Sequence, residues 1–402
     1  MRMIVRRPIF KRDRSVWGYE LVSDKPWSSD GVGTVSLKRL VSGQLEKLAA
    51  LGVGPGDGKK LFLNIDSEDL LHDAWSRKWD QCVFGICGGA VCSQACSGFA
   101  DRAHELGGSV ALEADGPSGA AVMDKCDIIK VSLAGKTPAD IVGIRKRYKE
   151  FSGKLLATDI PDWETFEGTK ALGFHYFQGP FFVEPRIEKG AKLQPSMVSK
   201  LQLLRELGAP VCEMQELARI IASDVSLSYR ILQYINSASF GLKNKIKSIQ
   251  QAISLLGLDE LKHWATVVTM TDLDSTPNGE ELAYMALQRA RFLSGLASTI
   301  KACRHTPETM FLLGLFSMLD ALLDHPMEKA LEGIPLAIDL KEGLCGADNE
   351  YGDCLRMLAA VERGDWEMAN GLLSRYGACV TKAATEYLKA SRWAARQLPN
   401  MK

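Results

Sequence analysis

Four closely spaced cysteines are a first candidate for a metal site: Cys82, Cys87, Cys92 and Cys96. A structural zinc or iron–sulfur site needs four thiolates that converge on the metal at about 2.3 Å. The C-x4-C-x4-C-x3-C spacing is not a usual pattern for such a site, and a strand would send Cys82 and Cys87 to opposite faces or ends. The spacing therefore favours free thiols, and metal binding by these cysteines is the alternative.

A second set of candidates consists of polar side chains within or directly after short apolar runs: Glu20, Asn64, Glu113, Lys130 and Gln178. Oxygen ligands that converge at strand ends, together with a group that activates water, are what metal-dependent hydrolysis of a phosphodiester requires. Such chemistry depends on whether the elements that carry these residues lie side by side.

The elements of the first half are short apolar runs that alternate with helical patterns up to about residue 186. The runs are β-branched or aliphatic blocks of strand length, typical of strands buried on both faces; they cover residues 4–10, 16–22, 61–65, 82–87, 109–113, 128–133, 154–158 and 176–183. Helical patterns occupy residues 35–51, 93–106, 138–151 and 163–172. This order predicts a parallel sheet with crossover helices, closed into a small (β/α) barrel.

The strand signal ends near residue 196, and the second half is predicted to be all-helical. Residues 249–256 show apolar side chains at i, i+3 and i+4, with Ser248 placed to cap this helix and Gly257 to end it. A charged segment with Pro and Gly precedes the helical half. We therefore expect the fold class α/β plus all-α, with domains at residues 1–190 and 191–402.

The composition excludes several classes of protein. The 402 residues include 49 basic and 49 acidic side chains, so the chain is neither a strongly basic nucleic-acid binder nor an acidic disordered protein. No apolar run reaches the roughly 18 residues of a membrane span, and the N-terminus lacks the apolar stretch of a signal peptide. Ten cysteines without an export signal indicate free thiols. We expect a cytoplasmic protein without a nucleic-acid partner, a membrane partner or a cofactor.

The first half carries a series of strand-end motifs in a fixed order: GYEL at 18–21, FLNI at 62–65, ALEADG at 111–116, IIKV at 128–131, LLATD at 155–159 and YFQGPFF at 176–182. This order resembles the EAL domain, the family of cyclic di-GMP phosphodiesterases, across nearly all of residues 1–185. In active members, a Glu of the name-giving motif, an Asn, a second Glu and an Asp pair hold the metals. A Lys and a later Glu assist with water and metal.

Four residues match the positions that this resemblance implies: Glu20, Asn64, Lys130 and Gln178. Glu113 takes the place of the first Asp of the pair. The resemblance therefore implies a site at the carboxyl ends of the strands, of which these five residues are the remnant.

The same resemblance implies acids that this chain lacks. Gly85, Ala114, Thr158 and Pro161 stand at positions expected to be acidic, and Asp24 replaces an Arg that would contact phosphate. Two Mg²⁺ ions that share so few carboxylates would lack charge neutralisation and octahedral coordination. We therefore expect a degenerate phosphodiesterase site without catalysis or bound metal, whose remaining polar groups plug the barrel mouth.

The second half resembles the HDOD domain, an all-helical output domain of bacterial signalling proteins. The resemblance rests on DVSLSYRILQYINSA at 224–238, followed by IKSIQQAISLLG at 246–257. The run GLFSMLDALL at 314–323 resembles the bacterial EAL–HDOD fusions often called YuxH-like, and this likeness covers essentially the whole chain. HD hydrolases bind metal through His and Asp, including a His-Asp pair, but this chain has Ser317-Met318 at that place.

Three further polar residues of the second half have structural interpretations. His263 is expected on a helix surface or in the core, and Asn236 and Ser237 are expected to end a helix.

Taken together, the resemblances imply a non-catalytic protein of bacterial signal transduction that acts through protein partners, in cyclic di-GMP-related regulation. The alternatives are a cyclic di-GMP phosphodiesterase with an altered metal site, and a receptor that binds cyclic di-GMP without cleaving it.

Overall fold

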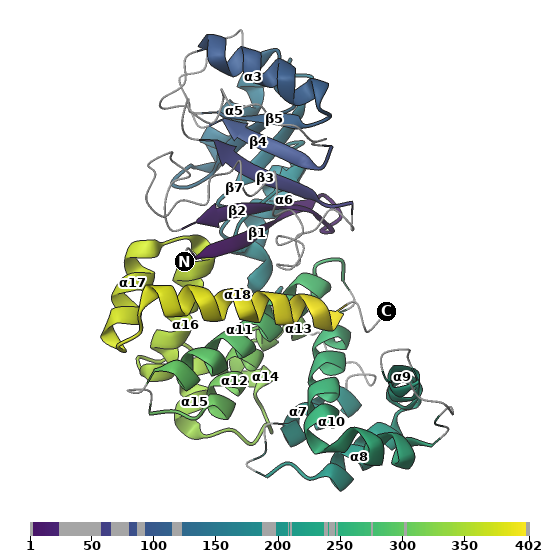
Figure 1. Cartoon of the computed structure of the whole chain (residues 1–402). Coiled ribbons are helices and arrows are strands. Elements are labelled where there is room, and N and C mark those ends of the chain that lie inside the picture. The colour runs from purple at the N-terminus through teal and green to yellow at the C-terminus, as the bar shows by residue number, and fades with distance from the viewer. Residues whose placement is uncertain are drawn as a thin grey trace. The chain divides into compact units, whose positions relative to one another are not determined.

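The fold is that of a computed structural model (Figure 1). The structure describes residues 3–23, 58–65, 80–86, 93–114, 123–186, 198–207, 209, 211–236, 240, 246, 248–274, 276–300 and 304–398. Within these ranges the chain divides into two compact units. One contains residues 1–184 and 358–392, and the other contains residues 185–357 and 393–402.

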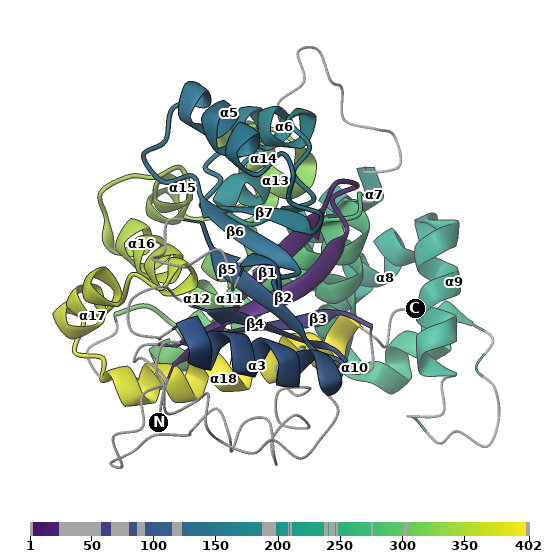
Figure 2. The same cartoon turned by 90° about the horizontal axis from the view of Figure 1, so that it is seen from above.

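Eight strands form a closed barrel in the order β1 to β8 (Figures 1 and 2). Each follows an apolar run of the sequence; their bounds are β1 Ile4–Lys11, β2 Val16–Ser23, β3 Lys60–Ile65, β4 Cys82–Ile86, β5 Ser109–Glu113, β6 Ile128–Ser132, β7 Lys154–Thr158 and β8 Tyr176–Phe177. From β2 to β8 the neighbouring strands are parallel. The predicted barrel is confirmed.

Two features of the barrel differ from the sequence prediction. β1 runs antiparallel to both β2 and β8, because the short β1–β2 connection forms a hairpin, and a parallel crossover needs a dozen or more residues. The predicted last strand stops at Phe177, and Pro180–Val183 forms a 3-10 helix, η2. Gly179 has φ 154°, and Pro180 has no backbone N–H for a ladder bond.

In the described part of the barrel unit up to residue 186, three helices lie outside the strands, at α3 Ser93–Glu105, α5 Pro138–Arg147 and α6 Trp163–Ala171 (Figure 2). The helix predicted at residues 35–51 lies outside the described residues. Thr137 and Asp140 form a capping box at the start of α5, and the Asp162 side chain caps α6. The barrel interior is packed with one side chain from each of six strands: Ile9, Phe62, Val83, Ala111, Ile128 and Leu156. A packed middle layer leaves space for a site only at the ends of the barrel.

The unit that holds the barrel also includes residues from near the C-terminus. They are the last turns of α16 (Glu350–Arg363), all of α17 (Trp366–Arg375) and most of α18 (Val380–Gln397). The predicted boundary near residue 190 stays a prediction, since residues 187–197 lie outside the described residues.

The second unit is built from helices, as predicted. Their bounds are α7 Val198–Leu207, α8 Met214–Ser223, α9 Val225–Ile235, α10 Ile249–Leu273, α11 Gly279–Thr299, α12 Pro307–Phe316, α13 Leu319–Leu323, α14 Met327–Ala330 and α15 Ile338–Leu344. Ser248 caps α10 by accepting a hydrogen bond from the Gln251 backbone, and Gly257 (φ 73°) interrupts its helical geometry. The predicted start is confirmed, and the predicted stop is a kink between two helical stretches. None of the helices in the described part of the chain has the length and apolar character to cross a membrane.

Candidate functional site at the mouth of the barrel

A cavity of about 200 Å³ lies where the parallel strands of the barrel end. Apart from Ala114, the described lining residues are charged, hydroxyl or amide side chains from β1, β2 and the chain around the ends of β5 to β8: Arg7, Glu20, Glu113, Lys130, Ser132, Thr158, Asp159 and Gln178. Such a lining above a packed apolar layer is a typical position for a ligand site in a (β/α) barrel.

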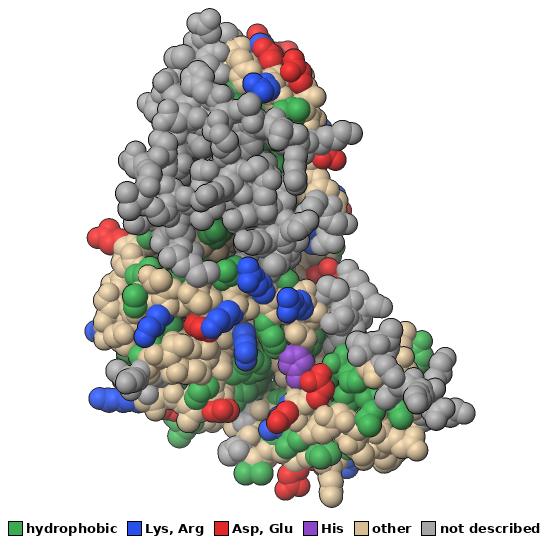
Figure 3. Space-filling model, in the orientation of Figure 1, with side chains coloured by type: hydrophobic (Ala, Val, Ile, Leu, Met, Phe, Trp, Pro, Cys, Tyr) green, Lys and Arg blue, Asp and Glu red, His purple; other side chains and the backbone are tan. Residues whose placement is uncertain are grey.

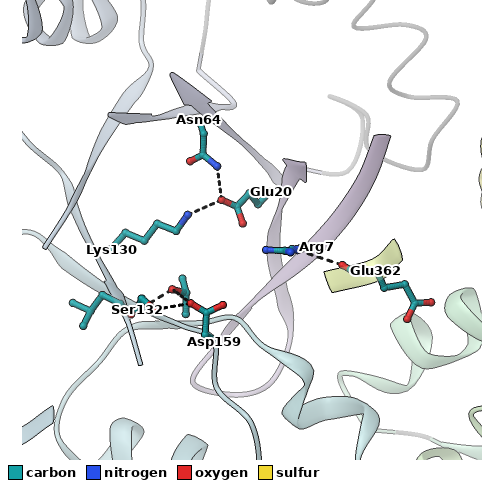
Figure 4. Close-up of polar contacts among 9 residues, drawn as sticks. Arg7, Glu20, Asn64, Lys130, Ser132, Asp159 and Glu362 are labelled. Carbon is teal, nitrogen blue, oxygen red and sulfur yellow. Dashed lines mark hydrogen bonds and ion pairs between the residues drawn. The ribbon is translucent and has the colours of Figure 1, made fainter. Parts of the chain in front are cut away.

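Glu20 lies at the centre of the polar contacts (Figure 4). Lys130 Nζ and Asn64 Nδ2 each donate to Glu20 Oε1, both at 2.7 Å. The Glu20 side chain is 3% exposed and that of Lys130 is 14% exposed. Burial raises the pKa of Glu20, but the charge and hydrogen bond of Lys130, with Asn64 and Arg7, outweigh it and lower the pKa to about 2. Glu20 is therefore a carboxylate whose charge an internal cation neutralises.

Asn64 and Gly85 lie opposite each other on β3 and β4. A Cβ atom at position 85 would lie 2.6 Å from Asn64 Oδ1 and 2.6 Å from Cε1 of Phe62. Real Cβ atoms do not approach other atoms this closely, so the side chains of β3 fill the space into which a residue larger than glycine would extend.

Asp159 and two hydroxyl groups form a second polar cluster at the mouth. Ser132 Oγ and Thr158 Oγ1 donate to Asp159 Oδ2 at 2.7 and 3.3 Å. Asp159 has φ 57°, in the left-handed region that non-glycine residues seldom adopt and that Asp tolerates better than most. The backbone thus sets the Asp159 carboxylate at the rim, where it is exposed.

The structure brings the five predicted site residues together. Glu20, Asn64 and Lys130 are hydrogen-bonded, and Glu113 and Gln178 line the same cavity. Their function stays a prediction. Asp24, the departure predicted to repel phosphate, lies outside the described residues.

Sequence reasoning missed two charged residues of the cavity, Arg7 and Asp159. Arg7 is opposite Glu20 in the β1–β2 pair, and the alternation of side chains along β1 could have indicated that it shares a face with Ile9. Asp159 directly follows a predicted strand, which is the position where barrel enzymes place site residues.

The cysteine cluster is only partly covered by the structure. Cys82 begins β4 and Cys96 lies in α3, and both are buried. Burial raises the pKa of Cys82 to about 12, so this thiol is protonated at neutral pH. Cys87 and Cys92 lie outside the described residues, and metal binding by the four cysteines stays a prediction.

In the helical unit, the polar residues singled out from the sequence have structural partners. Asn236 donates to the carbonyls of Leu232 and Ile246 and accepts from the Ile246 backbone, so it ties the end of α9 to the following chain. His263 contacts Gln397 Oε1 at 2.8 Å. Ser237 lies outside the described residues.

Ser317 is the residue that the sequence resemblance predicted at the place of the His-Asp pair of HD hydrolases. Its hydroxyl accepts from the buried Arg289 at 3.1 Å and donates to the Gly314 carbonyl at 2.7 Å. A guanidinium beside this position disfavours a metal cation there by charge repulsion.

Among the residues that the structure describes, the donor set of the barrel mouth does not fit the two-metal centre that the EAL resemblance implies. Glu20 already accepts from Lys130 and Asn64, Gly85 supplies no ligand, and Ala114 supplies none. Among the described residues, no three His, Cys, Asp or Glu side chains are grouped so that they could hold a metal ion. Two hard cations need more carboxylate ligands than this arrangement offers.

Comparison with known proteins finds one matching domain family and similar proteins in two bacteria. The HDOD domain family matches residues 193–332. The uncharacterized protein YuxH of Bacillus subtilis is 29% identical over 409 residues, which cover 97% of each chain. The cyclic di-GMP phosphodiesterase CdgJ of Vibrio cholerae is 31% identical over 272 residues, which cover 67% of this chain and 59% of that protein.

Among solved structures, an EAL domain protein of Listeria monocytogenes is similar, with a TM-score of 0.35 and 17% identity over 45% of this chain and 87% of that one. The YkuI protein of Bacillus subtilis, which has an EAL domain, shows a TM-score of 0.35 and 15% identity over 65% of this chain and 73% of its own. TM-scores of this size support no conclusion about activity. The predicted fold class, a barrel followed by a helical HDOD region, is confirmed.

The low pKa of Glu20 predicts an acid-dependent loss of stability. Since its folded pKa, about 2, is below its usual 4.5, its contribution is complete above pH 4.5 and is lost as the pH falls toward 2. We expect the stability difference between the wild type and Glu20→Gln to shrink by about 2 kcal/mol between pH 6 and pH 3, measured by urea unfolding. Glu150→Gln, at an exposed position, is the control. A constant difference would contradict the charged, paired state of Glu20.

Proposed function

We propose that this protein acts in bacterial signal transduction without catalysis, through contacts with protein partners, in cyclic di-GMP-related regulation. One observation carries the proposal: Lys130 neutralises the charge of Glu20, the carboxylate at the name-giving position of the resemblance, and a cation at that distance weakens the attraction of the carboxylate for a metal ion. The filled space beside Gly85 supports the same conclusion, since no second acid can be accommodated there without a shift.

Two comparisons support the regulatory part of the proposal. CdgJ is described as a cyclic di-GMP phosphodiesterase, and the HDOD family matches the helical half of this chain. The cytoplasmic location belongs to the proposal too and rests on the cysteine content of the sequence.

Exposed apolar side chains in the helical unit support contacts with a protein partner. Val225 and Tyr229 lie one turn apart on α9, and 87% and 65% of their surfaces are exposed. Met214, at the start of α8, is also exposed. Figure 3 shows apolar side chains gathered over α8 and α9. Apolar surface of this kind often marks a protein interaction site.

A hydrolysis experiment tests the absence of catalysis. The full chain is incubated with cyclic di-GMP and either Mg²⁺ or Mn²⁺, and the linear dinucleotide is quantified. We expect no product above the buffer background, because the described residues of the mouth do not supply the ligands for two metals. Turnover that Glu20→Ala abolishes would overturn the proposal.

A second experiment tests the part of the proposal that concerns a protein partner. The full chain serves as bait in an extract of the native bacterium, next to Tyr229→Ser on α9 and the control Ile338→Ser on α15, which is 78% exposed. We expect a protein that the wild type and Ile338→Ser retain and that Tyr229→Ser loses. Retention of nothing specific, or equal retention by all three, would count against an interaction surface on α9.

A cyclic di-GMP receptor without hydrolysis is the second candidate. The description of CdgJ favours it, and the exposed Asp159 carboxylate at the mouth disfavours it because a phosphate would be repelled there. Calorimetry separates the two candidates: heat of binding with cyclic di-GMP and no linear product would select the receptor.

A further inference from the structure

Gln178 at the mouth of the barrel carries a polar group that the protein itself leaves unsatisfied. The side chain is 4% exposed and lines the cavity, and its Nε2 has no hydrogen-bond partner among the described residues. A buried donor without a partner costs about 1–3 kcal/mol. An acceptor atom of a ligand in the cavity would remove this cost.

Arg7 supplies a cation close to Gln178. β1, which carries Arg7, is the neighbour of β8, and Gln178 directly follows β8. Arg7 Nε donates to the Glu362 carbonyl at 3.3 Å (Figure 4). That bond orients the guanidinium, whose Nη2 lies beside Gly364. Arg7 also lines the cavity, and a guanidinium N–H is a donor that suits a carboxylate. This side of the cavity therefore favours a carboxylate group.

Negatively charged side chains lie at the ends of β5 and β7. Glu113 ends β5 and Asp159 follows β7, and both line the cavity. Lys130 is paired with Glu20, so the other charged side chains among the described lining residues are one cation, Arg7, and two anions. Asp159 uses Oδ2 for Ser132 and Thr158, which leaves Oδ1 as an acceptor for an ammonium group.

We propose that the mouth of the barrel binds a small α-amino acid, with its carboxylate on Arg7 and Gln178 and its ammonium group on Asp159. The cavity volume of about 200 Å³ is below the roughly 300–1,000 Å³ typical of pockets for drug-sized ligands, which restricts the ligand to this size class. The inference rests on the proposed function in one respect: a metal-free mouth leaves these groups available for an organic ligand.

The experiment measures the melting temperature and the binding heat of the full chain with each standard L-amino acid at millimolar concentration. The best ligand is then compared with its two analogues that lack either the amino group or the carboxylate. We expect at least one amino acid to bind and each analogue to bind at least about tenfold more weakly, since each loses one charged contact.

Two conservative variants assign the contacts. Gln178→Met removes the unsatisfied donor and should weaken both the amino acid and its carboxylate analogue. Asp159→Asn tolerates the left-handed backbone and should weaken the amino acid while sparing the carboxylate analogue. Glu150→Gln, exposed elsewhere on the same unit, should change neither.

Two outcomes would overturn the inference: no amino acid binds, or an analogue with a single charge binds as tightly as the amino acid. These outcomes are separate from the failure of the proposed function, which is measured as hydrolysis of cyclic di-GMP.

Discussion

Lys130→Met is expected to lower the free energy of unfolding of the barrel by about 3–5 kcal/mol, because it leaves the Glu20 carboxylate buried without its cation. The two side chains meet at 2.7 Å and are 14% and 3% exposed. Removing one partner of such a pair is costly, whereas replacing both with uncharged groups often costs little. Urea unfolding followed by circular dichroism gives the measurement.

Two comparisons make the Lys130 result specific. In the double variant Glu20→Gln/Lys130→Met, we expect most of the lost stability to return. Lys125 and Asp101 form an ion pair of 2.6 Å whose side chains are 36% and 55% exposed, and Lys125→Met should cost less than about 1 kcal/mol. Equal losses for Lys130→Met and Lys125→Met would show that the pair in the barrel mouth is not the buried interaction described here.

Gly85→Glu is expected to destabilise the barrel by about 3–5 kcal/mol and to produce no hydrolysis of cyclic di-GMP. The new Cβ would meet Asn64 and Phe62 at 2.6 Å, and the added carboxylate would be buried close to Glu20. The variant puts back one acid that the EAL resemblance implies. If the missing ligand alone prevented metal binding, this variant would gain activity.

The control for added size and charge is Gly98→Glu on α3. Gly98 is exposed, and a Cβ there meets nothing within 4 Å, so we expect no loss of stability. Gly85→Ala adds the Cβ atom without a charge, so it separates the steric effect from the effect of the buried carboxylate. We expect it to lower the free energy of unfolding by about 1–3 kcal/mol. Turnover by Gly85→Glu with Mn²⁺ would contradict the view that β3 side chains close this position.

Local sequence patterns were sufficient to predict those elements whose structure depends on residues close together in the sequence. The apolar runs predicted seven of the strands within a residue or two at each end, because strands that are buried on both faces have continuous runs of apolar residues. Ser248 was predicted to cap α10 because the N-cap bond spans only three residues. The last strand was predicted too long. The aromatic residues Phe181 and Phe182 favour a strand, but they follow Gly179 and Pro180 and lie in a 3-10 helix.

The strand-end residues of the candidate site could also be identified from the sequence. Glu20, Asn64, Lys130 and Gln178 stand within or directly after apolar runs, and parallel strands bring such positions to one end of a barrel. The sequence thus determined a barrel, a helical second half, and a short list of residues for one end of the barrel.

Only the tertiary structure decided what those residues do to one another. The Glu20–Lys130 pair joins positions 110 residues apart, and it forms because barrel closure and strand register place both side chains in one layer. The entry of Arg7 into the same cavity depends on β1 running antiparallel between β2 and β8, and the orphaned amide of Gln178 depends on which groups lie within hydrogen-bond reach. No local periodicity encodes these contacts, because each is set by the packing of strands far apart in the chain.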